Sequence, residues 1–328
     1  MEWSVAVCFA AAKNGQLEVL QWARAEGCPW DEKIVVGAAM TGEVDTLAYA
    51  LDEGCPGREL ACPAAASEGQ EGVLQFAIDW GCPCGEMTLL QAAWRGIMPI
   101  LKLLRERGIQ WSAPACAKAA EGGHLDVVKW ARTEGCPWDA WTCSRAASGG
   151  HLDVLEWARD NGCPWDANTC TAAAGAGELG TLAWARARGC PWDATACALA
   201  AYNGHLQVLE YLRRNGCPWN EETCECAIEG GRLETLKYAR ANGCPWGLYT
   251  QAMRGAPSQQ VCPCILAMQM GYRTISLWAR ANGCPCGAGD STSVDVRQVE
   301  GAEGGEVEGS ASPLGHRGWA VNGLVPGM

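Results

Sequence analysis

The side chains with the most obvious chemistry are the cysteines, of which the 328-residue chain has 21. Most of them fall into two series that recur at a fixed spacing. The first series is Cys8, Cys62, Cys116, Cys143, Cys170, Cys197 and Cys224. The second series is Cys28, Cys55, Cys82, Cys136, Cys163, Cys190, Cys217 and Cys244. Thiolates ligate zinc and exchange disulfides, so a cysteine-based metal-binding or redox module is one hypothesis for this chain.

The spacing argues against crosslinks along either series. If successive members sit on packed helices, they lie about 8–10 Å apart, whereas a disulfide needs Cα atoms within about 7 Å. Cys136 and Cys143 are separated by a short proline-containing turn and are able to approach each other, as are Cys163 and Cys170. A zinc site would still need a full set of ligands, usually arranged as close pairs.

The Cys-Pro-Cys triplets at 82–84 and 284–286 supply such close pairs. Their second cysteines, however, occupy a position that holds tryptophan elsewhere in the chain, so they belong to the same periodic pattern. A buried cysteine behaves as a small hydrophobic residue. We therefore predict structural packing for the cysteines, with no metal site and no cofactor, and keep the thiol module as the alternative.

Histidines and arginines also recur without forming a catalytic set. His124, His151 and His205 share one position at the start of predicted helices, with no matching series of acids or nucleophiles, so we expect capping and turn contacts from them. The recurring arginines fall late in predicted helices, where a cation suits the negative end of the helix dipole. These are Arg132, Arg159, Arg186, Arg213 and Arg240. We predict that the chain is not an enzyme.

All these positions are set by an internal repeat. Glycine stands every 27 residues at Gly27, Gly54, Gly81, Gly108, Gly135, Gly162, Gly189, Gly216 and Gly243. A second unbroken glycine series runs from Gly15 to Gly231, and an unbroken alanine series runs from Ala11 to Ala227, at the same spacing. Self-similarity at a fixed period is the signature of a repeat architecture.

Each unit predicts two short helices joined by turns. Asp166 is a candidate N-cap, Cys170 and Ala173 supply a small inner face, and Gly177 supplies a left-handed turn. The following helix carries one apolar stripe and ends at a glycine that is followed by proline. Two such helices cannot bury their apolar stripe alone, so neighbouring units must stack. The predicted fold is an all-α solenoid of about ten stacked helix-turn-helix repeats with short turns between them.

Tryptophan marks most of the junctions between units. The junction residues are Trp30, Trp111, Trp138, Trp165, Trp192, Trp219 and Trp246. A tryptophan fixed in register beside proline is best explained by filling the gap between units, where it buries a large apolar area. We therefore predict packing for these side chains in preference to a ladder for an aromatic or sugar ligand.

Three segments carry a resemblance to a known family. The runs Gly-His-Leu-Asp-Val at 123–127 and 150–154 and Gly-His-Leu-Gln-Val at 204–208, each preceded by a pair of small residues, resemble ankyrin repeats. The resemblance covers roughly residues 8–286 and implies paired antiparallel helices with a partner-binding concave face. Ankyrin units have about 33 residues and a Thr-Pro-Leu-His opening, whereas these units have 27 and a Gly-Cys-Pro-Trp junction. We therefore expect tight turns where the family builds a projecting β-hairpin.

The periodic pattern predicts the domain organisation. Residues 1–286 form the ankyrin-like repeat domain, with an insertion near 248–261 that shifts the register by 13 residues before a tenth, degenerate unit. We expect this insertion to be a surface loop. Residues 287–328 are rich in Gly, Ser and Glu and poor in large apolar side chains, a composition that predicts a disordered tail.

Comparison of the units also shows which positions the scaffold leaves free. A position that varies while its neighbours are fixed faces solvent or a partner, and large amphipathic side chains there suit binding hot spots. The predicted partner-binding residues on the first-helix face are Trp94, Trp141, Tyr202, Glu121, Asn168, Glu222 and Glu229. The predicted function is a protein-protein interaction scaffold that uses this face.

Composition narrows the class of partner. The net charge of −12 and the pI of about 4.9 disfavour nucleic acid, which is bound through clustered Lys and Arg. No run of apolar residues is long enough to span a membrane, and the first residues lack the basic segment of a signal peptide. We expect a monomeric intracellular protein, cytoplasmic, that binds another protein.

The packing role of the junction tryptophans is testable at Trp165. Replacing it with alanine should lower the free energy of unfolding by about 3–5 kcal/mol, the usual cost of truncating a packed tryptophan. Thermal unfolding of the full chain measures the change. A variant that melts like the parent would refute the packing role.

Overall fold

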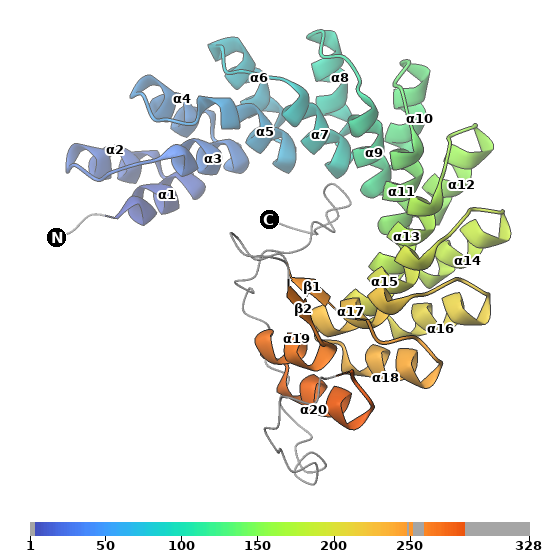
Figure 1. Cartoon of the computed structure of the whole chain (residues 1–328). Helices are drawn as coiled ribbons and strands as arrows, with labels where there is room; N and C mark the ends of the chain where they lie inside the picture. Colours follow the sequence, from blue (N-terminus) through green and yellow to red (C-terminus); the bar gives the residue numbers. More distant parts are fainter. Residues whose placement is uncertain (1–3, 248, 252–258, 286–328) are drawn as a thin grey trace. The chain divides into compact units, whose positions relative to one another are not determined.

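The computed structural model describes residues 4–247, 249–251 and 259–285 (Figure 1). They fall into two compact units, residues 1–165 and 166–328, and each is described by itself. Helices alternate along both: odd-numbered helices are the first helices of a pair, and even-numbered helices are the second.

The first unit contains six helix pairs. Their bounds are α1 Val5–Lys13, α2 Leu17–Ala25, α3 Glu32–Thr41, α4 Val44–Asp52, α5 Arg58–Glu68, α6 Glu71–Trp80, α7 Glu86–Arg95, α8 Met98–Glu106, α9 Ala113–Glu121, α10 Leu125–Thr133, α11 Ala140–Ser148 and α12 Leu152–Asp160. Each helix has 9 to 11 residues, so a single pair has little interior of its own.

The second unit contains four helix pairs and one short hairpin. Their bounds are α13 Ala167–Ala176, α14 Leu179–Ala187, α15 Ala194–Asn203, α16 Leu206–Arg214, α17 Glu221–Glu229, α18 Leu233–Ala241, β1 Tyr249–Gln251, β2 Gln259–Val261, α19 Pro263–Gln269 and α20 Arg273–Ala281. The predicted all-α repeat fold is confirmed, with β1 and β2 as a local addition to it.

Polar caps and left-handed glycines set the ends of the helices. The Asp166 carboxylate accepts a hydrogen bond from the Asn168 amide at 3.0 Å and so caps α13, as its position predicted. Gly177 ends this helix in the left-handed conformation, at φ +82°. A side chain would resist that conformation, which explains the unbroken glycine series.

The first helices of successive pairs pack against each other more extensively than the second helices do. Their facing side chains are small. Cys170, Ala173 and Ala174 on α13 are fully buried, as are Cys197 and Ala200 on α15. Because these side chains are short, neighbouring helices approach closely, and the core runs from one pair to the next within each unit.

The second helices supply the large apolar side chains of the core. One repeat position is completely buried in every pair from α1–α2 to α17–α18. It holds Leu20, Leu47, Leu74, Leu101, Val128, Leu155, Leu182, Leu209 and Leu236. Each of these side chains extends the core of its own unit, so the stacking predicted from the repeat is observed pair by pair within both units.

The insertion before α19 differs from the surface loop that we expected. Strands β1 and β2 pair antiparallel, with Tyr249 opposite Val261 and Gln251 opposite Gln259. Backbone pairing of the two ends satisfies amides that an open loop would leave to water. The predicted disordered tail at 287–328 lies outside the described residues. In the described part of the chain, every helix is too short or too polar to span a bilayer.

The glycines differ in how much space is left for a side chain. A Cβ at Gly230, which has the ordinary helical φ of −78°, would lie 1.9 Å from the Tyr202 carbonyl oxygen of the preceding pair. A Cβ at Gly180, inside α14, would meet nothing within 4 Å.

We therefore expect opposite effects from two alanine substitutions. Gly230→Ala should lower the free energy of unfolding by about 1–3 kcal/mol through overpacking. Gly180→Ala should raise it by about 0.5 kcal/mol, because alanine is the better helix former. Urea unfolding of the full chain measures both, and equal midpoints for the two variants would contradict the close approach.

Candidate functional site

The junction tryptophans are packed between an arginine and an aromatic ring. The guanidinium of Arg132 lies 4.1 Å from the Trp138 ring centroid, and the ring of Trp157 meets Trp138 edge-on at 5.9 Å. The Arg213, Trp219 and Tyr238 side chains repeat this arrangement in the second unit. The junction ring is thus engaged within the protein by a cation and by a second ring, which supports packing over an open ligand ladder.

The recurring arginines have a second local contact. Arg186 and Arg213 donate hydrogen bonds to the carbonyl oxygens of Cys190 and Cys217 at 3.1 and 3.2 Å. These carbonyls lie just beyond the ends of α14 and α16, so the arginines satisfy backbone acceptors that the helices leave unpaired. Their recurrence is explained by the junction and requires no acidic ligand.

The histidines link one helix pair to the preceding one. His124 lies before α10, and its Nε2 is 2.9 Å from the Trp94 carbonyl oxygen at the end of α7. His205 makes the same contact with the Gly175 carbonyl oxygen at 3.1 Å. We expected capping and turn contacts from these histidines; the two rings leave their own helices uncapped and bond instead to a carbonyl oxygen of the preceding pair.

The junction cysteines close each helix pair. The Cys163 thiol, after α12, contacts the Asp139 carbonyl oxygen that precedes α11 at 3.4 Å, and Cys217 contacts the Asp193 carbonyl oxygen at 3.3 Å. Thiols are weak donors with small apolar bodies, which suits a partly buried carbonyl at the start of the pair. This contact gives the junction series a structural role.

The two cysteine series meet within several of the helix pairs, but not as we suggested. Cys136 is hydrogen-bonded to Cys116, which precedes it by 20 residues, and Cys163 to Cys143. From the spacing we had expected that Cys136 could approach Cys143, and Cys163 could approach Cys170, across the turn. The antiparallel helices instead bring the junction thiol back beside the first helix of its own pair. None of the 20 cysteines in the described ranges forms a disulfide.

Most of these thiols are poor nucleophiles. Burial raises the pKa of Cys55 to about 11 and is the main reason that the pKa of Cys8 rises to about 12. The pKa values of Cys84, Cys136 and Cys244 are instead lowered; for Cys84, a hydrogen bond from Cys62, with smaller contributions from a hydrogen bond with Thr88 and from the positive charge of Arg107, lowers the pKa to about 7. Cys84 is half-buried, so its thiolate is the one most open to reaction among the repeat cysteines.

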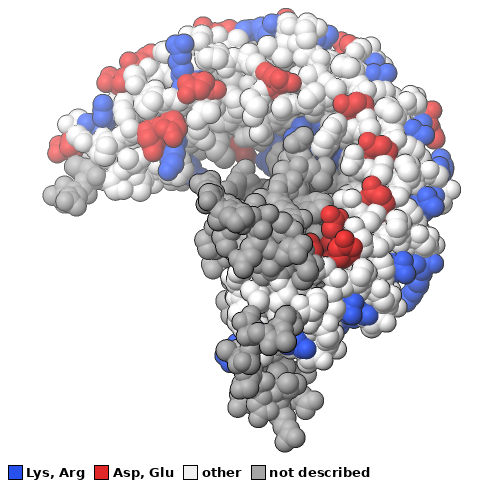
Figure 2. All heavy atoms as spheres, in the orientation of Figure 1, with Lys and Arg blue, Asp and Glu red and all other residues white. Residues whose placement is uncertain are grey.

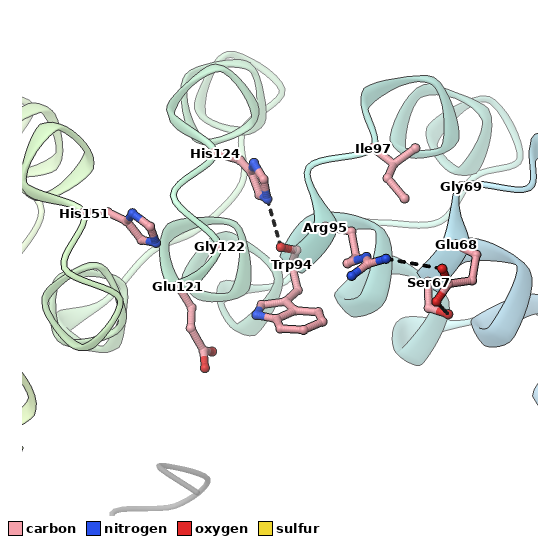
Figure 3. A pocket seen from close by; sticks show the side chains of 10 residues that line it. All are labelled: Ser67, Glu68, Gly69, Trp94, Arg95, Ile97, Glu121, Gly122, His124 and His151. Carbon is pink, nitrogen blue, oxygen red and sulfur yellow. Dashed lines mark hydrogen bonds and ion pairs between the residues drawn. The ribbon is translucent and has the colours of Figure 1, made fainter. Parts of the chain in front are cut away.

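A surface groove lies at the C-terminal ends of α5, α7 and α9 in the first unit (Figure 3). It has a volume of about 650 Å³. Its lining residues are Ser67, Glu68, Gly69, Trp94, Arg95, Ile97, Glu121, Gly122, His124 and His151. Two of the predicted partner-binding residues, Trp94 and Glu121, therefore belong to one groove, and in Figure 3 their side chains project to the same side.

Trp94 is the main apolar feature of this groove. Its side chain sits at the end of α7 and is 42% exposed, whereas the alanines before it, Ala92 and Ala93, are fully buried. The Arg95 guanidinium lies 5.9 Å from the Trp94 ring centroid. A large aromatic side chain held on a rigid helix at this exposure is typical of a binding anchor.

Ion pairs within and between the helices hold the charged residues of this groove. Arg95 pairs with Glu68 at 3.3 Å, and Glu121 pairs with Lys118 at 2.9 Å and with Arg145 at 3.7 Å. Glu121 was predicted to face a partner, and it does line the groove, but its charge is already balanced within the protein. We had not singled out Arg95 and Glu68, although they occupy the same repeat position in adjacent units with opposite charges.

Trp141 lies in the first turn of α11, and its side chain is half-buried. The Arg145 guanidinium lies 5.2 Å from its ring centroid. Arg145 therefore contacts both Trp141 and Glu121, which places the third predicted residue of this unit beside the groove through a shared cation. Trp141 is not itself part of the groove lining.

The other predicted residues belong to the second unit. Tyr202 at the end of α15 is half-buried, and burial, followed by the charge of Glu229, raises the pKa of its hydroxyl. Glu222 accepts a weak hydrogen bond from Asn220 at 3.4 Å, and Asn168 donates one to the Asp166 carboxylate at 3.1 Å. The structure thus brings Tyr202 and Glu229 together, while Asn168 and Glu222 lie in the first turns of α13 and α17.

Comparison with known proteins gives one similarity of fold. No protein-family model and no curated protein matches the chain. Among solved structures, the chain is similar to the ankyrin repeat domain of human ASB11, with 16% identical residues and a TM-score of 0.40, over 48% of this chain and 84% of that one. The repeat architecture follows from the packing of the helix pairs themselves.

The low pKa of Cys84 generates a reactivity prediction. Because the thiolate is the nucleophile, the rate of Cys84 alkylation by iodoacetamide should rise as pH increases through about 7 and then level off. Cys62→Ala removes the donated hydrogen bond and should shift this midpoint upward, towards the value of about 8.5 for an ordinary thiol.

Peptide mapping by mass spectrometry measures the rates, with Cys55 as the internal control. Cys84→Ser should remove the fast site and leave the alkylation of Cys55 unchanged. Alkylation of Cys84 no faster than that of Cys55 at neutral pH would contradict the assignment.

Proposed function

We propose that the chain is a protein-binding scaffold and that the groove around Trp94 receives a segment of the partner. The observation that carries this proposal is the exposed Trp94 ring at the end of a rigid helix, in a groove whose charged residues are already paired with each other. Because the charges are paired, the part of the groove that a partner can cover with most gain is the apolar Trp94 ring. The partner segment is therefore one that covers the ring with an apolar side chain.

Charge distribution supports a protein partner. On the face drawn in Figure 2, acidic and basic side chains both lie on the described surface, and the chain as a whole has a net charge of −12. Nucleic-acid binding rests on clustered Lys and Arg, which a net negative charge disfavours. The paired charges at the groove rim fit a different use, because rim charges adjust the rate and orientation of association more than its strength.

The proposed mechanism is recognition without turnover. Trp94, Glu121 and Trp141 in the first unit, and Tyr202, Asn168, Glu222 and Glu229 in the second, are the residues proposed to contact protein partners. The histidines and the buried thiols at the junctions hold helix pairs together, so their recurrence needs no catalytic role. A monomeric intracellular scaffold is the form of the protein that we propose.

Substitution of Trp94 tests the groove. Trp94→Ala should weaken binding by at least about 2 kcal/mol, or roughly 30-fold, as the loss of a hot-spot aromatic does. Trp22→Ala is the matched control, because this tryptophan is 55% exposed on α2 and lies outside the groove. It should leave affinity unchanged.

The partner is first found in cells by placing a photo-crosslinking amino acid at position 97 of the full chain, a position that lies in the groove lining and leaves Trp94 intact. Titration of the identified protein against both purified variants then gives the affinities, once circular dichroism shows that both are folded. Equal affinity of the Trp94 and Trp22 variants for the crosslinked protein would remove the groove from the proposal.

A further inference from the structure

Three thiols converge at the α19–α20 helix pair. Cys262 immediately precedes α19, Cys264 lies in the first turn of that helix, and Cys284 follows α20. Their sulfur atoms all lie within 4.8 Å of one another, and those of Cys262 and Cys264 are 3.1 Å apart. We propose that these three thiols bind a zinc ion, which tethers the start of α19 to the end of α20.

The distances suit zinc after small side-chain adjustments. Zinc–sulfur bonds of about 2.3 Å in a tetrahedral site place the sulfur atoms about 3.8 Å from each other. The sulfur–sulfur distance of 3.1 Å and the upper limit of 4.8 Å each differ from that value by at most about 1 Å. Soft sulfur ligands favour zinc over magnesium or calcium, which prefer oxygen.

The surroundings hold the three cysteines in place. Cys264 is completely buried and Cys262 nearly so, and both pack with Ala279, against which Trp246 and Cys284 also lie. The Ser276 hydroxyl donates to the Cys264 carbonyl oxygen at 2.7 Å, and the Cys262 carbonyl accepts from two amides of α19 at 3.0 Å. A ligand set with a fixed backbone and an apolar shell binds its metal with less reorganisation.

Comparison with the other helix pairs isolates the feature that makes this site. Cys264 and Cys284 are 20 residues apart and occupy the positions that Cys197 and Cys217 hold in an ordinary pair. The repeat therefore supplies two of the thiols. Cys262 is the additional one, and it stands directly after the β1–β2 insertion, where the 27-residue register is broken.

The chemistry of binding is a metal-for-proton exchange. Three thiols lose three protons and form three zinc–sulfur bonds, which leaves one tetrahedral position for a water molecule or a further ligand. The resulting link joins the start of α19, at Cys262 and Cys264, to Cys284 just after the end of α20. Helix α19 has seven residues, fewer than any other helix here described, so it gains most from a tether that does not depend on helix length.

Metal analysis of the full chain tests the proposal. The protein is reduced, loaded with Zn²⁺, freed of unbound metal and analysed by mass spectrometry for zinc; Co²⁺ replaces Zn²⁺ for absorption spectroscopy. We expect one tightly held metal ion per chain and intense sulfur-to-cobalt charge-transfer bands. Cys262→Ser and Cys264→Ser should each weaken metal binding by at least about tenfold and reduce these bands.

Cys197→Ser is the matched control, because Cys197 holds the same repeat position as Cys264 in a pair without a third thiol. It should keep the metal. Cys286 lies outside the described residues and is retained in every variant. Hydrogen exchange guards against unfolding as the cause of metal loss: amides of α13–α18 should exchange alike in all proteins, whereas zinc should slow exchange in α19 and α20 of the parent only.

Three results would overturn the proposal. The first is a reduced parent protein that retains no metal after loading. The second is a Cys262→Ser variant that binds metal as tightly as the parent. The third is that Cys262 or Cys264 forms a disulfide, and the protein retains no metal, when the reductant is removed in the presence of zinc.

Discussion

Each helix pair leaves its apolar face uncovered unless a neighbouring pair packs against it, because two helices of nine or ten residues enclose almost no interior. Small side chains on the first helices allow neighbouring pairs to pack closely enough to cover these faces. Alanine and cysteine at the facing positions let helix backbones approach until a carbonyl oxygen of one pair touches a glycine of the next, as at Tyr202 and Gly230. The alanine series reflects this approach, whereas the unbroken glycine series reflect left-handed turns, and a change at Gly230 affects two pairs at once.

The junction residues convert that stacking into a fixed geometry. The thiol of Cys163 closes its own pair through a carbonyl oxygen, and the Arg–Trp–aromatic stack at Trp138 joins successive pairs. The recurrence of cysteine is therefore explained by its size and weak donor capacity without any redox chemistry. With the backbone held by buried contacts, side chains such as Trp94 are left to vary, and a rigid backbone beneath a variable surface is the arrangement that recognition requires.

The repeat, the helix caps and the buried face could be predicted because the same residue types recur at the same position of each unit. Contacts between different positions of the repeat could not be predicted in this way. The pairing of Cys116 with Cys136 depends on how the chain folds back, and the link between Glu121 and Arg145 depends on side-chain direction as well as spacing. Cys262 escaped notice because the insertion shifts it away from both cysteine series, to a position that holds Glu222 in the preceding unit. The paired strands of the insertion gave no periodic signal at all.

The departures from the repeat carry the specific chemistry of this chain. A residue that follows the pattern is explained by packing, as the junction arginines and histidines are, and its function is shared with every other unit. Trp94 stands at a position that varies between units and holds residues as different as Ser67, Gly175 and Tyr202, and Cys262 stands where the preceding unit carries glutamate. Each adds one group to the stacked repeats. Trp94 adds an exposed ring beside paired charges, and Cys262 adds a third thiol beside Cys264 and Cys284. Because the scaffold does not need either addition for its own stacking, both are best explained by something that binds there.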